Sequence, residues 1–134
     1  MRNAVASALV VMSLMPLTGG AVEPLMGSVV TAASNPGDQF VPAVAWDHDH
    51  KRWLLVWEQD VSGVRQIVGR LIANTGSPLG DSIFLTEASS DQTDPHVVYD
   101  PGHDRYVVVW VSEYSAVDTD IAGPVHYLEA GDLD

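Results

Sequence analysis

The chain has 134 residues, enough for a single domain. Its 18 acidic and six basic residues give a net charge of −12, which disfavours nucleic acids and anionic membranes as partners. It contains no Cys, so disulfides cannot stabilise the fold.

Residues 1–21 have the layout of a secretory signal peptide. Arg2 precedes an apolar run at 4–17, and a Gly-Gly-Ala sequence ends at Ala21. The run is shorter than the about 20 apolar residues that a membrane span needs, and Pro16 interrupts it. We therefore expect cleavage after Ala21 and a secreted or periplasmic protein with no membrane attachment after cleavage.

The remaining chain contains one unit of 53 residues twice. The stretch PAVAWDHDHKRWLLVW, starting at Pro42, aligns with PHVVYDPGHDRYVVVW, starting at Pro95. Further along, QIVGRL (66–71) aligns with DIAGPV (120–125) after a shift of one residue. This register divides the mature chain into three parts. They are an N-terminal segment at 22–37, a first unit at 38–90 and an incomplete second unit at 91–134.

Each unit has the pattern of short strands separated by turn residues, and we find no convincing helical periodicity. In chain order, strands are expected at 27–31, 41–46, 53–57, 64–73 and 82–86, with the first of them an outer strand.

The strand expected at 53–57 is apolar on both faces, as in a propeller blade that neighbouring blades cover on both sides. We predict an all-β fold of two four-stranded antiparallel propeller-like blades, and a duplicated β-sandwich is the alternative. Because a ring typically needs about 4–8 blades, the chain would be a partial propeller. A homo-oligomer or further repeats in a longer chain would complete the ring. The outer faces of both sheets are expected to be uncovered.

The pattern P-x-V-[AV]-[WY]-D-x-x-x-x-R-[WY]-x-x-V-W, followed by a D-I-x-G-like strand, resembles the blade repeats of large secreted bacterial β-propeller proteins. The resemblance covers 38–125, although that family normally has many more units. It implies an adhesin, lectin, scaffold or glycosidase domain. The second unit departs from the pattern at Pro124, which cannot donate to a strand ladder, so this strand is expected at an edge.

The sequence WDHDHKRW (46–53) raises the question of a metal site. Its candidate ligands are Asp47, His48, Asp49 and His50. The matching stretch of the second unit contains the turn dipeptide Pro101-Gly102, and alternate residues of a turn do not reliably converge on one ion. We therefore favour a hairpin turn in which Asp47 and Asp100 cap the backbone.

Aromatic side chains and arginines recur at matching positions of the two units. For Trp46, Trp53, Trp57 and Trp110 we favour core packing over stacking on sugars. For Arg52 and Arg105 we favour structural pairs with the turn carboxylates.

Three acidic residues, Glu58, Asp60 and Glu113, could supply the carboxylate pair of a glycosidase at the mouth of a ring. This signal is weak in so acidic a chain, and we assign no catalytic residue. Asp94 and the acids of 118–120 could hold calcium, but the spacing of a twelve-residue calcium loop is missing. We therefore expect no cofactor, with calcium as the one possible exception.

These observations predict an exported, non-enzymatic binding or adhesion module of the β-propeller type. Its ligand would be a glycan or a protein, and the sequence does not indicate which residues bind it. The alternative is the N-terminal fragment of a secreted propeller glycoside hydrolase.

Overall fold

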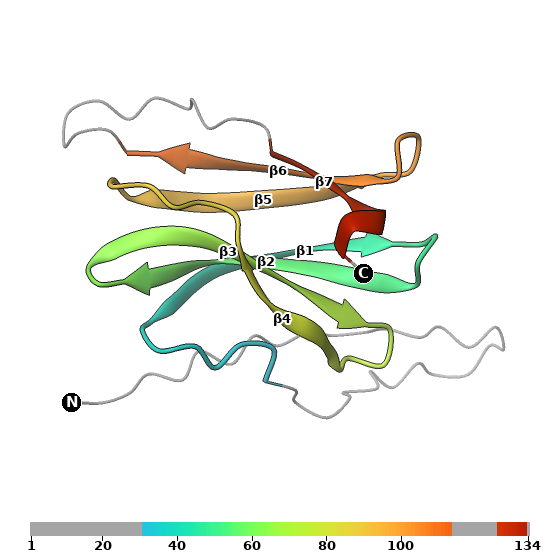
Figure 1. The fold of residues 1–134 in the computed structure, drawn as a ribbon, viewed down its shortest axis with the longest axis horizontal. Helices are drawn as coiled ribbons and strands as arrows, with labels where there is room; N and C mark the ends of the chain where they lie inside the picture. The colour runs from blue at the N-terminus through green and yellow to red at the C-terminus, as the bar shows by residue number, and fades with distance from the viewer. Residues whose placement is uncertain (1–30, 114–125, 134) are drawn as a thin grey trace, which may run out of the picture.

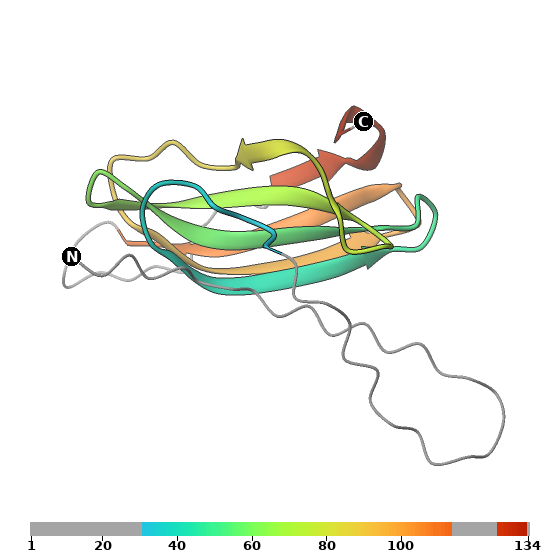
Figure 2. The same cartoon turned by 90° about the horizontal axis from the view of Figure 1, so that it is seen from below.

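The computed structural model describes residues 31–113 and 126–133, which form two antiparallel sheets packed face to face (Figure 1). The first sheet has the spatial order β1 (Gln39–Asp47), β2 (Arg52–Val61), β3 (Val64–Ala73) and β4 (Pro78–Phe84). The second has the order β5 (Gln92–Asp100), β6 (Arg105–Ser112) and β7 (His126–Glu129). A short 3-10 helix, η1 (Ala130–Leu133), follows β7. The strands of the two sheets run in similar directions (Figures 1 and 2).

The all-β prediction is confirmed, and the described residues contain no α-helix. The second sheet has three strands among these residues, one fewer than the first. Several expected features lie outside the described residues: the leader at 1–21, nearly all of the strand at 27–31, the acids at 118–120, and the segment 120–125 with Pro124.

The hairpins β1–β2 and β5–β6 are built alike. The first strand of each hairpin, β1 or β5, contains a bulge, and each bulge holds a residue with positive φ, Val41 at 45° and Asp94 at 53°. Each turn also has a residue with positive φ, Lys51 at 55° and Asp104 at 51°. These matching backbone features lie 53 residues apart.

The third strands do not keep this offset. Ile72 in β3 pairs with Trp53, whereas Leu128 in β7 pairs with Tyr106. The strand β7 therefore lies three residues later than a 53-residue offset would place it, so the second unit is longer between its second and third strands.

The bounds expected for the fourth strand, 82–86, were wrong. The turn after β3 closes early, because the backbone N–H of Ala73 donates to the carbonyl of Ser77 at 2.8 Å, and β4 begins at the next residue, Pro78. At the other end, the Thr86 hydroxyl accepts from the backbone N–H of Ile67 at 2.8 Å. After Phe84 the backbone N–H groups of Leu85 and Thr86 both donate to the Ile67 carbonyl, at 2.8 and 3.3 Å, and the Thr86 hydroxyl adds this third bond.

The core lies between the two sheets. It contains Leu54 and Val56 from β2, and Tyr106, Val108 and Trp110 from β6, together with side chains of β1, β3, β5 and η1. The strand β5, at one edge of the second sheet, packs across β1, β2 and β3. Burial of this layer supplies most of the hydrophobic stabilisation of the fold.

A second apolar cluster covers the other face of the first sheet. Leu55 and Trp57 of β2 are each 2 % exposed there and pack with Val68, Ile72 and Ala32. The strand β2 is therefore buried on both faces, as predicted. The expectation that the outer face of the first sheet is uncovered was wrong, because the chain preceding β1 contributes Ala32 to this cluster.

Candidate functional site

Residues 48–51 form the turn between β1 and β2, and Asp47 holds this turn together. Its buried carboxylate accepts from the backbone N–H groups of Asp49 at 3.0 Å and His50 at 2.9 Å. The His50 ring nitrogen Nδ1 lies 2.9 Å from the second oxygen. These are the contacts of a turn-capping aspartate.

The same carboxylate also joins the two sheets. The hydroxyl of Tyr106, on β6, donates to Asp47 Oδ2 at 3.0 Å, and Arg52 Nε lies 3.4 Å from that oxygen. Arg52 also donates to the carbonyl of Ala130 in η1. Burial alone would raise the pKa of Asp47, but the hydrogen bonds from His50 and Tyr106 outweigh it and lower the pKa.

A second polar contact between the sheets surrounds Tyr99 of β5. Its hydroxyl lies 2.9 Å from Asp49 Oδ2 and 2.7 Å from Asp104 Oδ1, while His48 Nδ1 lies 2.6 Å from the other oxygen of Asp49. Burial and the hydrogen bonds to the two carboxylates raise the pKa of Tyr99 above its ordinary value of 10.0.

The closest side-chain contacts of the candidate metal ligands pair Asp47 with His50 and His48 with Asp49, and His50 Nδ1 also lies 3.6 Å from Asp104 Oδ1. In the part of the chain that the structure describes, no group of three or more His, Cys, Asp or Glu is arranged to hold a metal ion. The Asp-His-Asp-His run serves the turn and the contact between the sheets.

The turn of the second hairpin repeats the first in a more exposed form. Asp100 accepts from the backbone N–H of Gly102 at 3.1 Å, and its Oδ2 lies 2.8 Å from His103 Nδ1 and 3.4 Å from Arg105 Nε. The contact with His103 makes the largest contribution to lowering the pKa of Asp100. Both arginines thus pair with the turn carboxylates.

We expect the turn carboxylates to make the fold sensitive to acid. The pKa of Asp47 is lower in the folded chain than its ordinary value of 3.8, so the unfolded chain binds the proton first. The stabilisation is complete well above pH 3.8 and is lost as the pH falls below it through the folded pKa. Urea unfolding of wild type and Asp47→Asn between about pH 7 and pH 3 tests this, because their difference in stability should narrow in acid. A constant difference would contradict the assignment.

The turn can also be tested by exchange between the units. Replacing His48 and Asp49 with the Pro-Gly of the second unit should preserve the fold, because Asp47 and His50 are retained. The exchange removes Asp49 as a partner of Tyr99, so a small loss of stability is expected. Calorimetric titration of the wild type with zinc should show no site tighter than the micromolar range, about 8 kcal/mol. A nanomolar site lost in His50→Ala would establish a metal site instead.

The three acids considered for catalysis do not form an open pair. Glu58 is 2 % exposed, and its two oxygens accept from the backbone N–H of Asp94 at 2.8 Å and from Arg65 Nη1 at 3.0 Å. Asp60 caps the β2–β3 turn through the N–H of Gly63 at 3.0 Å. Glu58, which the sequence offered only as a weak candidate, ties the bulge of β5 to the first sheet. Glu113, the third acid, accepts a hydrogen bond from the Thr93 hydroxyl at 3.2 Å.

Two of the four tryptophans are core residues. Trp57 and Trp110 are 2 % and 4 % exposed, and the indole N–H of Trp110 donates to the side chain of Gln92 at 2.8 Å. Trp46 and Trp53 are half-buried, and their rings lie 4.7 Å apart on the outer face of the first sheet. Core packing is therefore seen for Trp57 and Trp110, whereas Trp46 and Trp53 pack against each other and remain partly exposed.

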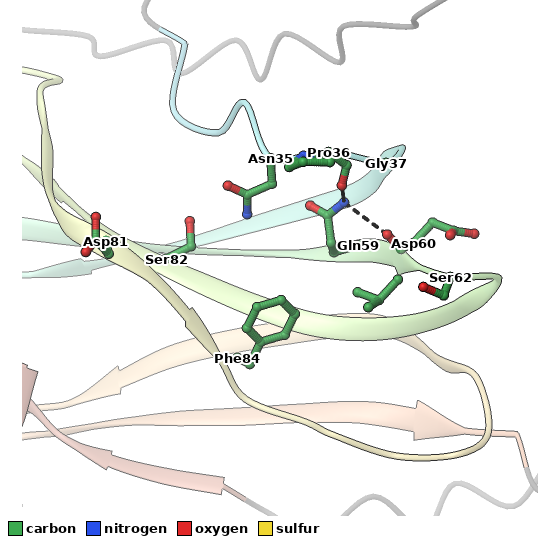
Figure 3. Close-up of a pocket in the computed structure, with 10 residues that line it drawn as sticks. Asn35, Pro36, Gly37, Gln59, Asp60, Ser62, Asp81, Ser82 and Phe84 are labelled. Carbon is green, nitrogen blue, oxygen red and sulfur yellow. Dashed lines mark hydrogen bonds between the residues drawn. The ribbon is translucent and has the colours of Figure 1, made fainter.

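A hollow of about 550 Å³ lies beside the first sheet, between β4 and the chain that leads into β1 (Figure 3). Its lining comes from three segments: Asn35, Pro36 and Gly37 before β1; Gln59, Asp60, Val61 and Ser62 at the end of β2; and Asp81, Ser82 and Phe84 of β4.

The rim of this hollow is held by the backbone before β1. Gln59 Nε2 donates to the carbonyl of Pro36 at 2.8 Å (Figure 3). Gly37 has a φ of 94°, and a Cβ there would collide with the carbonyl of Asp60, so only glycine fits.

Four polar side chains that line the hollow have no hydrogen-bond partner among the described residues. These are the side chains of Asn35, Ser62, Asp81 and Ser82. Phe84 is 48 % exposed, and its ring lies on the same side as the Ser82 hydroxyl (Figure 3). The hollow thus combines an apolar ring with a carboxylate, an amide and hydroxyls.

The sequence alone does not indicate this hollow. Its one local signal is the turn sequence Asn35-Pro36-Gly37, since Asp81, Ser82 and Phe84 look like ordinary members of a strand. The three segments come together only through the tertiary fold.

Comparisons with models of known protein families, with curated proteins and with solved structures gave no significant match. Among the described residues, no helix is long and apolar enough to cross a membrane.

Proposed function

We propose that this chain is an exported, non-enzymatic binding module of the β-propeller type and that it binds a glycan in the hollow beside β4. The observation that carries the proposal is the exposed ring of Phe84 next to the unpaired side chains of Asn35, Asp81 and Ser82. An aromatic ring offers an apolar face to a sugar ring, while carboxylate, amide and hydroxyl groups bond its hydroxyls.

Export rests on the leader-like layout of residues 1–21. The two-sheet arrangement and the resemblance of 38–125 to secreted propeller repeats support the module type. A released protein whose N-terminus lies near Val22 would agree with this part of the proposal, and an intact Met1 would contradict it.

Binding is tested by screening soluble oligosaccharides against the purified chain and measuring the best ligand by calorimetry. Phe84→Ala should weaken binding roughly tenfold, since an aromatic contact contributes about 0.5–1.5 kcal/mol beyond its buried area. Asp81→Asn should weaken it less, because the amide still accepts a hydrogen bond.

The matched control is Leu79→Ala, which removes another exposed apolar side chain of β4 that does not line the hollow. Its affinity should equal that of the wild type. Binding that is unaffected by Phe84→Ala and Asp81→Asn, or the absence of any glycan ligand, would overturn the proposal.

A further inference from the structure

The outer face of the second sheet exposes apolar side chains from three neighbouring strands. Val98 of β5, Val109 of β6 and Tyr127 of β7 are 57 %, 39 % and 53 % exposed. Val107 pairs with Val98 on one side and with Tyr127 on the other, so these three residues form one row across the sheet. Because alternate residues of a strand share a face, Val109 adjoins this row. We call these four residues the outer patch.

The outer patch repeats the surface by which the first sheet binds the second. The hairpins β1–β2 and β5–β6 share their register, so positions 53 residues apart occupy equivalent places. The equivalents of Val98, Val107 and Val109 are Ala45, Leu54 and Val56, which lie in the core between the sheets. On the first sheet, this face is covered by another sheet.

The charged groups of this face lie beside the patch. Arg105 lies over the ring of Tyr127 at 4.0 Å, and its Nε is 3.4 Å from a carboxylate oxygen of Asp100. Glu129 stands opposite Arg105 in the neighbouring strand. An apolar centre beside a charged rim is the usual composition of a protein interface.

The choice of partner depends on which surfaces of the molecule still expose apolar side chains. The opposite face, on the first sheet, is covered at its centre, where Ala32 of the chain before β1 packs on Leu55 and Trp57. Its most exposed large apolar side chains, Val44 and Phe84, stand on the two edge strands β1 and β4, so it offers no continuous apolar surface for head-to-tail stacking. The outer patch of another molecule does offer one. A contact in which both molecules use the same surface is closed by a twofold axis and stops at two copies.

We propose that the outer patch is a self-association surface, on which a second copy of this chain packs its own outer patch around a twofold axis. Val98, Val107, Val109 and Tyr127 form the apolar centre of the contact. The surface lies on the side of the molecule away from β4 and the hollow, so this proposal is independent of glycan binding (Figure 1).

Sedimentation of the purified full chain over a range of concentrations tests the proposal, with a monomer–dimer equilibrium as the expected result. The double variant Val98→Asp/Val109→Asp should raise the dissociation constant by about 100-fold or more, because the contact would bury unpaired carboxylates. The control Leu79→Asp places the same charge on an exposed apolar position of β4 and should leave the equilibrium unchanged. A monomer at all concentrations, or a dimer indifferent to the double variant, would overturn the proposal.

Chemical cross-linking provides a test that does not depend on how well the double variant folds. The chain has no Cys, so Val109→Cys introduces one thiol near the centre of the patch. A flexible bismaleimide should link this variant into dimers and should leave Leu79→Cys monomeric. Failure to link Val109→Cys, equal linking of both variants, or a ladder of higher oligomers in sedimentation would each contradict the twofold contact.

Discussion

Replacing Asp47 with alanine should lower the free energy of unfolding by about 3–5 kcal/mol, as expected when one partner of a buried ion pair is removed. Arg52 is 5 % exposed and Tyr106 fully buried, so the variant leaves a guanidinium and a phenol without their shared acceptor. The turn would also lose the carboxylate that caps its backbone. Because a domain is stable by only about 5–15 kcal/mol, much of the stability would be lost.

Urea unfolding at neutral pH measures this loss, and the second hairpin provides the matched control. Asp100 holds the equivalent turn with equivalent contacts, but its side chain is 31 % exposed and pairs with a partly exposed Arg105. Asp100→Ala should therefore cost much less than Asp47→Ala. Equal losses in the two variants would show that capping alone, rather than the buried contact between the sheets, explains the role of Asp47.

Trp110→Ala should be as damaging, with a loss of about 3–5 kcal/mol, as for large aromatic side chains removed from a core. The indole is 4 % exposed and lies between the sheets. Its removal leaves a cavity and deprives the buried Gln92 amide oxygen of a donor. The free energy of unfolding from denaturant titration is the measurement.

Trp46→Ala is the comparison for this second prediction, because Trp46 is half-buried on the outer face of the first sheet. The loss of unfolding free energy in Trp46→Ala should be clearly smaller than in Trp110→Ala. Neither variant should change affinity for a glycan bound in the hollow, since neither residue lines it. A tryptophan variant that keeps its stability but loses the glycan would reassign that ring to the binding site.

The sequence predicted the hairpins well because their information is local. Apolar runs bounded by turn residues indicated β2 and β3, and the exchange of Asp49 for Gly102 at matching positions showed that 48–51 is a turn. The capping roles of Asp47 and Asp100 follow from the chemistry of aspartate before a turn. The fourth strand was misplaced because Gly80, at a φ of 66°, looks like a loop residue, although the strand continues through it.

The contacts between the sheets could not be predicted in this way. Tyr106 is 59 residues from Asp47 along the chain, and nothing in either local pattern indicates that they meet. Glu58 looked available for catalysis because an acid near the end of a strand is usually exposed. Its burial depends on the Asp94 amide of the other sheet, which only the packed structure brings within reach.

The double role of Asp47 links events that are usually separate in folding. One carboxylate completes a turn between neighbouring strands and also accepts from a tyrosine of the opposite sheet. The first hairpin alone would leave this carboxylate in water, and Tyr106 would lack its acceptor. Neither sheet therefore has a complete set of polar partners by itself. The two sheets should form and lose their structure in a single cooperative transition, without a stable state in which one sheet is folded and the other is not.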